Sequence, residues 1–386
     1  MNFNLSEEQK AFQDTARAFA RAELTPNAAR WDAEAYFPVE VIRKAGAMGF
    51  CGIYSPESAG GMGLSRLDAH LIFEQLAYGC TATTAYITIH NMCTWMLTTF
   101  GSEELVAQWG PDLTSGEKLA SYCLTEPNAG SDAASLKASA RREGDHYILN
   151  GSKCFISGAG ATDVLILMAR TGGEGAKGIS CLLVPADLPG IEYGRKEDKM
   201  GWNCQPTRTI SFDNVRVPVS NRVGNEGDGF KFAMKGLDGG RINIATCSLG
   251  TAQAALDTAQ RYLNERKQFG RALADFQALQ FKLADMATDL VAARQMVRLA
   301  ASKLDENDPE ATLYCAMAKR FATDAGFAIC NDALQIHGGY GYIREYPLER
   351  HVRDTRVHQI LEGTNEIMRH IIARRLLLEG ATEILQ

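Results

Sequence analysis

The carboxylate of Glu362 lies in a short break between two stretches of helical pattern, where it could act as a base. The stretch from His358 to Arg375 reads HQILEGTNEIMRHIIARR, and the break holds residues 362 to 365. Apolar Ile360 and Leu361 come directly before the carboxylate. Loss of water around a carboxylate raises its proton affinity, as a base requires. Taken alone, however, an acid before a helix start is also typical of a solvated flank that the helix dipole favours.

A polar loop from Tyr122 to Ser135, YCLTEPNAGSDAAS, could hold a ligand. Its hydroxyls and backbone amides could face the polar atoms of a bound molecule. The same residue types also make ordinary turns, and the local pattern favours that interpretation.

Cations and glycines near two helix ends could hold an anion. Arg266 ends one helical segment, where it suits the helix dipole or could grip a phosphate. Gly338 and Gly339 follow another helix, as a C-cap or as a place where the backbone approaches a flat or phosphorylated ligand. Arg241, in GLDGGRINIA, is expected to open a helix. An arginine there opposes the dipole, so we expect an acceptor nearby, such as Asp238 or Glu362.

Several familiar signatures are absent. The stretch SGAGATD comes closest to G-x-G-x-x-G but has Asp163 at the third glycine, and there is no P-loop and no G-x-S-x-G. No H-E-x-x-H occurs, and the ten cysteines form no C-x-x-C pair. A Rossmann fold, a P-loop nucleotidase and a metal enzyme are therefore not supported, and the cysteines fit free thiols in a reducing compartment.

The elements that must position these residues fall into three zones. Residues 1–119 show helical patterns, and Ser6 with Gln9 fits a capping box. Residues 120–229 carry strand patterns over 163–170, 178–185 and 207–217, and Asn150-Gly151 predicts a hairpin turn. Residues 230–386 return to helices, predicted over about 242–263, 279–304 and 310–336 and after Thr364, which indicates a helical bundle. In the first of these helices, apolar residues repeat every seven positions, at Ile242, Leu249, Leu256 and Leu263.

Composition is that of an ordinary globular protein, with 386 residues, 46% hydrophobic, 22% charged and a net charge of −6. This charge argues against a general nucleic-acid partner, and no apolar run is long enough for a membrane span. The start shows no leader pattern, so we expect a cytoplasmic chain, or a mitochondrial matrix protein if it is a trimmed form.

Together and in this order, the motifs resemble the acyl-CoA dehydrogenase family over essentially the whole chain. They are TEPNAGSD (125–132), R-x-x-F-G (266–270), QIHGGYGY (335–342) and RDTRVHQILEGTNEI (353–367). The resemblance implies a mainly α fold with a central β-domain: an N-terminal helical domain (1–119), a middle β-barrel-like domain (120–229) and a C-terminal four-helix bundle (230–386). It also implies FAD, an acyl-CoA substrate, a homotetramer and electron-transfer flavoprotein as electron acceptor, without nucleic acid or membrane.

The resemblance also assigns roles. Glu362 would remove the α-proton of the acyl thioester, the β-hydrogen would leave as hydride to the flavin, and backbone donors including the Glu362 amide would hold the thioester oxygen. The residues expected to line the flavin are Tyr122, Leu124, Thr125, Gly130, Ser131, Phe155, Ile156 and Ser157. Those expected to bind FAD across a subunit interface are Arg266, Phe269, Phe276, Gln277, Gln335, Ile336, Gly338 and Gly339. Thr364, Asn365 and Glu366 would meet FAD at a helix start. Ser131, Asp238, Arg241 and Arg374 would contact the CoA thioester.

Within the family, residues 83–97, 200–208 and 236–250 are most similar to members that act on isobutyryl-CoA and give methacrylyl-CoA in valine breakdown. Relatives that act on isovaleryl-CoA carry their base just before the arginine matching Arg241. Here that position is Gly240, which cannot act as a base. 2-Methylbutyryl-CoA and butyryl-CoA stay open as substrates, because a methylene is worth only about 1–3 kcal/mol of discrimination. A flavin oxidase and a non-catalytic binding protein on the same fold stay open as alternatives. An aspartate base would favour nitroalkane oxidase, whereas this chain has glutamate.

Overall fold

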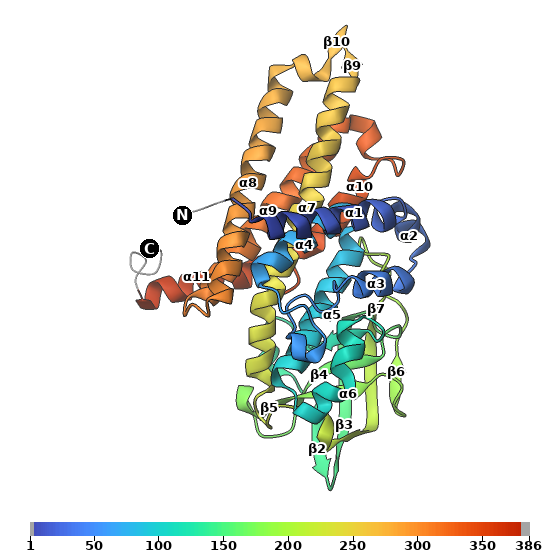
Figure 1. Cartoon of the computed structure of the whole chain (residues 1–386), viewed down its shortest axis with the longest axis vertical. Helices are drawn as coiled ribbons and strands as arrows, with labels where there is room; N and C mark the ends of the chain where they lie inside the picture. The colour runs from blue at the N-terminus through green and yellow to red at the C-terminus, as the bar shows by residue number, and fades with distance from the viewer. Residues whose placement is uncertain (1–3, 380–386) are drawn as a thin grey trace.

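The computed structural model describes residues 4–379, and its N-terminal part is a layer of helices (Figure 1). The predicted capping box is confirmed, because the Ser6 and Gln9 side chains each accept a hydrogen bond from the other residue's backbone amide. Ser65 and Ser102 also cap the helices that follow them. The helices are α1 (Glu7–Phe19), continued by a π-helical turn (Ala20–Leu24), α2 (Ala28–Glu34), α3 (Val39–Ala47), α4 (Arg66–Gly79), α5 (Thr81–Phe100) and α6 (Glu103–Thr114).

A mostly antiparallel sheet follows, in the order β6-β7-β3-β2-β4-β5-β8, with β1 paired in parallel to β4. The three predicted strands are confirmed as β4, β5 and β7. All but the last residues of β4 and β5 are buried, which explains their unbroken apolar sequence. The strands are β1 (Ala120–Cys123), β2 (Ser139–Glu143), β3 (His146–Ser157), β4 (Val164–Arg170), β5 (Ile179–Pro185), β6 (Ile191–Tyr193), β7 (Thr207–Pro218) and β8 (Arg222–Val223).

The hairpin predicted at Asn150-Gly151 is wrong, because both residues lie inside β3. Asn150 is opposite Ser139 of β2, and Gly151 is opposite Phe212 of β7, so neighbours on both edges hold the segment extended. Gly151 instead serves a shift in register between β3 and β7, where a side chain would collide with Ala138.

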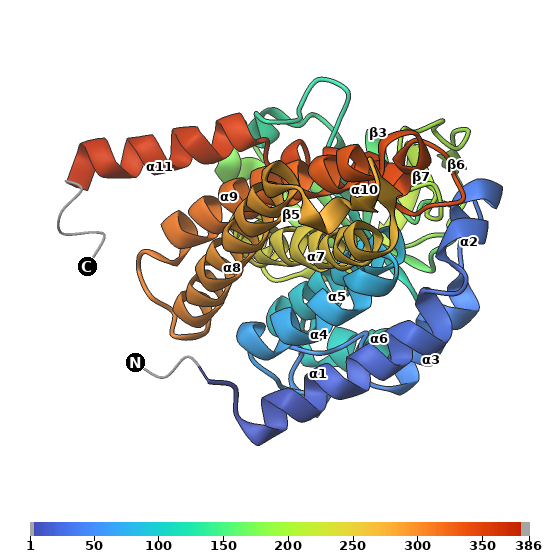
Figure 2. The same ribbon diagram turned by 90° about the horizontal axis from the view of Figure 1, so that it is seen from above.

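The C-terminal part is a helical bundle in which α7 runs from beside the sheet to the β9–β10 hairpin at the far end of the molecule (Figure 1). The predicted seven-residue spacing is confirmed, since Ile242, Leu249 and Leu263 are buried in the bundle core. Seen from above, α11 projects away from the body (Figure 2). The elements are α7 (Gly229–Glu265), β9 (Lys267–Gln268), β10 (Arg271–Ala272), α8 (Gln277–Asp305), α9 (Ala311–His337), α10 (Leu348–Arg356) and α11 (Asn365–Glu379).

The prediction that Arg241 opens a helix is wrong, because α7 begins at Gly229 and continues through Gly240. The two glycines before Arg241 are sites of close packing: a side chain on Gly239 would collide with the Arg66 guanidinium. The dipole argument therefore does not apply at Arg241. The acceptor that it predicted is nevertheless present, since Arg241 donates a hydrogen bond to Asp238 at 2.7 Å.

Candidate active site

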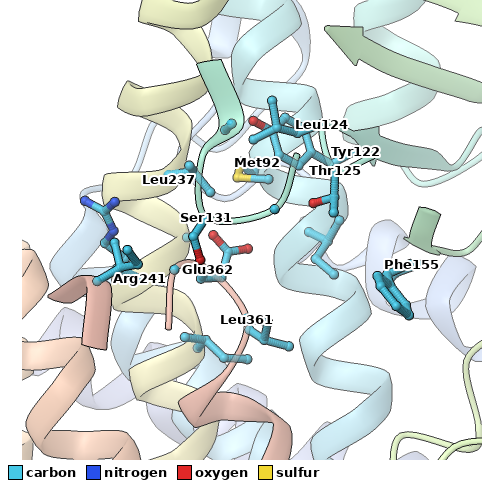
Figure 3. Close-up of a pocket in the computed structure, with 18 of the residues that line it drawn as sticks. Met92, Tyr122, Leu124, Thr125, Ser131, Phe155, Leu237, Arg241, Leu361 and Glu362 are labelled. Atoms are coloured by element: carbon cyan, nitrogen blue, oxygen red, sulfur yellow. The ribbon is translucent and has the colours of Figure 1, made fainter. Parts of the chain in front are cut away.

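A cavity of about 360 Å³ opens where the N-terminal helices, the sheet and the bundle meet (Figure 3). Its volume lies in the range typical of small-ligand sites. Figure 3 shows Glu362 below Ser131, with Arg241 on one side and Phe155 on the other. Much of the remaining wall is apolar, with Ile89, Met92, Leu237, Ile244 and Leu361 among its residues.

Glu362 faces this cavity from the turn before α11, with a φ of 56° that is unusual for a residue with a side chain. Its Oε2 atom has almost no exposed surface and no hydrogen-bond partner within the described chain. Burial raises the pKa of the carboxyl to about 7, and the charges of Arg241 and Lys319 oppose this rise. A carboxyl in this state can be ionised at neutral pH and still bind a proton readily.

Gly240 leaves the room that the Glu362 carboxylate occupies, because a Cβ on Gly240 would collide with Oε2. The carboxylate and a side chain at position 240 therefore exclude each other in this arrangement. The two apolar residues before Glu362 lie in different environments. Leu361 lines the cavity and packs against the N-terminal core, whereas Ile360 is 51% exposed.

The turn at 362–365 is fastened to α9. The Nζ of Lys319, a fully buried side chain, donates to the Gly363 carbonyl at 2.7 Å and to Asn365 Oδ1 at 2.8 Å. The Asn365 amide in turn donates to Thr323 Oγ1 at 2.9 Å and to Asp324 Oδ1 at 2.7 Å. These bonds fix the backbone on both sides of Gly363, which has a φ of 85°.

On the opposite side of the cavity, the loop at 124–131 is fastened to β3. The buried Lys153 Nζ donates to the Leu124 carbonyl at 2.9 Å and to Glu126 Oε1 at 2.7 Å, and the Cys154 amide donates to the Thr125 carbonyl. Burial raises the pKa of Glu126, but hydrogen bonds from the Lys137 amide and from Lys153 outweigh it and lower that pKa below its ordinary value.

Arg241 faces the cavity from α7 as one half of a buried ion pair. Its partner Asp238 also accepts a hydrogen bond from Thr312 at 2.7 Å. Desolvation raises the pKa of Asp238 even though the Arg241 charge lowers it. The pair places one cation beside the Glu362 carboxylate.

The comparisons with known proteins agree over most of the chain. Residues 6–117, 121–215 and 227–377 match the N-terminal, middle and C-terminal domains of acyl-CoA dehydrogenase. The chain belongs to the acyl-CoA dehydrogenase family. The predicted fold class is confirmed, with a helical N-terminal part, a middle sheet and a C-terminal helical bundle.

Two curated relatives of this acyl-CoA dehydrogenase are mitochondrial isobutyryl-CoA dehydrogenases. The one from Bos taurus is 58% identical over 98% of this chain and 91% of its own length. The one from Dictyostelium discoideum is 56% identical over 96% of this chain and 90% of its own length. Among solved structures, butyryl-CoA dehydrogenase from Megasphaera elsdenii is 40% identical with a TM-score of 0.95, covering 98% of this chain and all of that one. A chain from a structural study of the electron-transferring flavoprotein of Acidaminococcus fermentans is 42% identical, with the same TM-score and coverage.

Members of the family are FAD-dependent, and the cavity can receive a flat ring. Phe155 is 70% exposed at a φ of 57°, because β3 bulges there and turns the side chain out of the sheet. The buried Tyr122 hydroxyl has no partner in the described chain, and a Cβ on Gly130 would meet nothing within 4 Å. All eight residues predicted to line the flavin border this one cavity: Tyr122, Leu124, Thr125, Gly130, Ser131, Phe155, Ile156 and Ser157.

The residues predicted to bind FAD across a subunit interface lie elsewhere. Five of them line a second, open pocket of about 500 Å³: Arg266, Gln335, Ile336, Gly338 and Gly339. Phe269, 92% exposed, stands edge-on to Phe276 near the β9–β10 hairpin, and Gln277 begins α8. None of these residues borders the Glu362 cavity within the described chain.

The remaining predicted residues lie at the start of α11 and along it. Thr364 caps the helix by accepting from the Ile367 amide, and Glu366 is exposed beside it. Asn365 is buried, and its side chain is hydrogen-bonded to Lys319 and Thr323 of α9. Of the four residues predicted to contact the thioester, Ser131 and Arg241 border the cavity and Asp238 stands behind Arg241. Arg374 is exposed on α11 and does not border it.

Sequence reasoning missed Trp202, which borders the cavity at a φ of 56°. Its amide donates to the buried Asp354 at 2.7 Å, and its indole N–H donates to His358 Nε2 at 3.3 Å. His358 Nδ1 therefore carries the proton and donates to Ser248 Oγ at 2.7 Å. The stretch 200–208, which contains Trp202, entered the sequence analysis only as a similarity to relatives that act on isobutyryl-CoA. Lys319 was missed too, because nothing around it in the sequence marks it.

The sequence predicts neither a membrane span nor a metal site. Within residues 4–379, no helix is long and apolar enough to cross a membrane. Over the same range, no group of three or more His, Cys, Asp or Glu side chains could hold a metal ion.

Proposed function

We propose that this acyl-CoA dehydrogenase converts isobutyryl-CoA to methacrylyl-CoA, a step of valine breakdown, with Glu362 as the base. The observation that carries the proposal is the buried, unpartnered Oε2 of Glu362 at the wall of a largely apolar cavity. The identity of 56–58% to two isobutyryl-CoA dehydrogenases supports the short branched substrate over straight-chain and oxidase alternatives.

The proposed reaction breaks two C–H bonds of the acyl group and forms one C=C bond. Glu362 takes the α-hydrogen as a proton, and the electron pair of that bond becomes the new double bond. Bound FAD supplies the acceptor for the hydride that leaves the β-carbon. The apolar wall keeps water from the carboxylate, which strengthens it as a base, and the Arg241 charge keeps it ionised near neutral pH.

Ser131, Arg241 and Asp238 are proposed to orient the CoA thioester. The first two border the cavity, and Asp238 holds the Arg241 guanidinium at 2.7 Å. The Glu362 amide is proposed as a donor to the thioester oxygen, where negative charge develops as the proton leaves. Arg374 is proposed to act on the distant part of CoA, since it does not border the cavity.

We propose a homotetramer whose subunits complete each other's FAD sites. The open pocket around Arg266, Gln335 and Gly339 is separate from the Glu362 cavity, so one cofactor that meets both sets needs a second copy of the chain. Exposed Phe281, Val291 and Leu299 on α8 support a subunit contact. Electron-transfer flavoprotein is the proposed electron acceptor, in keeping with the similarity to a chain studied with that protein.

We also propose the three domains 1–119, 120–229 and 230–386, which the matched domains at 6–117, 121–215 and 227–377 support. The compartment is proposed to be a reducing one, cytoplasm or mitochondrial matrix. All ten cysteines are buried and free, which suits such a compartment.

The test is an anaerobic titration of the purified yellow protein with isobutyryl-, 2-methylbutyryl-, butyryl- and isovaleryl-CoA, followed by flavin absorbance. We expect isobutyryl-CoA to bleach the flavin fastest, by about 10-fold or more over isovaleryl-CoA, because one methylene is worth about 1–3 kcal/mol. If none of the four bleaches the flavin, the dehydrogenase proposal fails. If butyryl-CoA is fastest, only the substrate assignment fails.

A further inference from the structure

Lys319 is a fully buried cation that lies behind the Glu362 turn and has no role in the proposed chemistry so far. It belongs to α9, 44 residues before Gly363 in the chain, and donates to the Gly363 carbonyl and to Asn365 Oδ1. In the described part of the chain it makes no ion pair with a carboxylate, whereas Arg241 is paired with Asp238. Its charge is therefore not neutralised by a direct partner.

We propose that Lys319 is a positioning residue for the reaction, which locks the Glu362 turn in its productive shape and places a positive charge behind the base. The inference rests on the proposed role of Glu362. Lys319 does not border the cavity and so does not touch the substrate.

The turn needs such a lock because two consecutive residues, Glu362 and Gly363, have left-handed φ angles of 56° and 85°. A residue with a side chain reaches this region only where its surroundings hold it. The Lys319 bond to the Gly363 carbonyl holds the residue directly after the proposed base, and the bond to Asn365 holds the first residue of α11. Without Lys319, the partly buried Gly363 carbonyl would lose its donor and Glu362 would be free to turn away from the cavity.

The charge of Lys319 acts on the same carboxyl. The groups that interact with Glu362 come from every element around it: Arg241 from α7, Lys319 from α9, Tyr122 from β1 and Cys93 from α5. Of these, Arg241 and then Lys319 lower the pKa of Glu362 against the larger effect of burial. Desolvation lowers the pKa of Lys319 to about 7, while Glu362, Asp324 and Glu366 raise it and Arg241 lowers it. The two buried groups thus favour each other's charged forms.

The experiment compares Lys319→Met, which keeps the length of the side chain without its charge, with Lys319→Arg, which keeps a charge. The readout is the pH dependence of flavin bleaching by saturating isobutyryl-CoA in the FAD-loaded protein. In Lys319→Met we expect the midpoint of the pH profile to move up by about one pH unit, with about fivefold slower bleaching at pH 7 that recovers at higher pH. KM should change less than about twofold, and Lys319→Arg should keep the wild-type midpoint.

Lys153→Met is the matched control, because it removes another buried lysine that holds the other wall of the cavity. Thr323→Val is the uncharged control, since it removes a partner of Asn365 without changing charge. Both should leave the pH midpoint of the FAD-loaded fraction in place. An unchanged midpoint in Lys319→Met, or the same shift in either control, would overturn the charge effect.

A second readout does not need turnover. Hydrogen–deuterium exchange should show the amides of 360–368 exchanging about tenfold faster in Lys319→Met than in wild type, with α5 and the sheet unchanged. Equal exchange would overturn the positioning role. If none of the four acyl-CoA esters bleaches the flavin of the wild-type protein, the proposed function fails. The exchange measurement still decides whether Lys319 holds the turn. If Lys319→Met does not fold, Lys319→Gln takes its place in both measurements.

Discussion

Two turns meet across the cavity, and a buried lysine holds each of them from behind. Lys153 holds the 124–131 loop and is paired at 2.7 Å with Glu126, which also accepts two backbone amides. Lys319 holds the 362–365 turn through a carbonyl and an amide oxygen, without a paired carboxylate in the described chain. Both side chains are fully buried.

The difference lies in what each charge does. The Lys153 charge is used within its own ion pair, which suits the first loop to its proposed role as a fixed surface for the cofactor. The Lys319 charge is left to act on Glu362, which suits the second turn to its proposed role in the chemistry. A buried cation in a protein therefore either completes a scaffold or tunes a nearby acid, and its partners decide which.

The largest expected effect is on the second turn. Glu362→Gln should slow flavin reduction by isobutyryl-CoA by about 10³-fold or more, because a positioned base contributes about 10²–10⁴-fold and the amide cannot take a proton. FAD content and acyl-CoA binding should stay close to wild type, since the first loop is untouched. Stopped-flow absorbance and equilibrium binding measure the two quantities. Near-normal turnover would remove Glu362 from its role as the base.

The next effect is on the first loop. Lys153→Met leaves Glu126 buried without its cation, and breaking such a pair costs about 3–5 kcal/mol. We expect a lower melting temperature, measured by thermal unfolding. We also expect a loss of bound FAD, measured by the ratio of flavin absorbance to protein absorbance. The midpoint of the pH profile in the loaded fraction should not move. Full FAD content would mean that the Lys153 contacts to Leu124 and Glu126 do not shape the cofactor surface.

The smallest expected effect is the pH dependence of stability that Glu362 itself creates. Its pKa rises from 4.5 to about 7 on folding, so folding favours the protonated form. The stabilising contribution of Glu362 to the free energy of unfolding is fully present below about pH 4.5 and is lost as pH rises through 7. Glu362→Gln should therefore be more stable than wild type at pH 8, by about 1–3 kcal/mol, and no more stable at pH 4.5. A stability difference between Glu362→Gln and wild type that stays the same from pH 4.5 to pH 8, measured by thermal unfolding, would contradict the raised pKa.

The sequence by itself determined much of the architecture. The seven-residue spacing of α7, the apolar runs of β4 and β5 and the capping box of α1 depend on neighbours a few residues away, so local pattern specifies them. The motifs around Thr125, Arg266, Gln335 and Glu362 were sufficient to indicate the family. The break that holds Glu362 was visible in the same way.

Only the tertiary structure decided the details that depend on distant partners. Asn150 and Gly151 are extended because β2 and β7 pair with them on both sides, against their preference for a turn. Arg241 lies inside a continuous helix, and the two glycines before it are explained by close packing against Arg66 and Glu362 and not by a helix start. Lys319 bonds to the Gly363 carbonyl, 44 positions further along the sequence. Burial and electrostatic environment depend on which segments pack together. For that reason the sequence could mark Glu362 as a candidate base but could not show how it is held or charged.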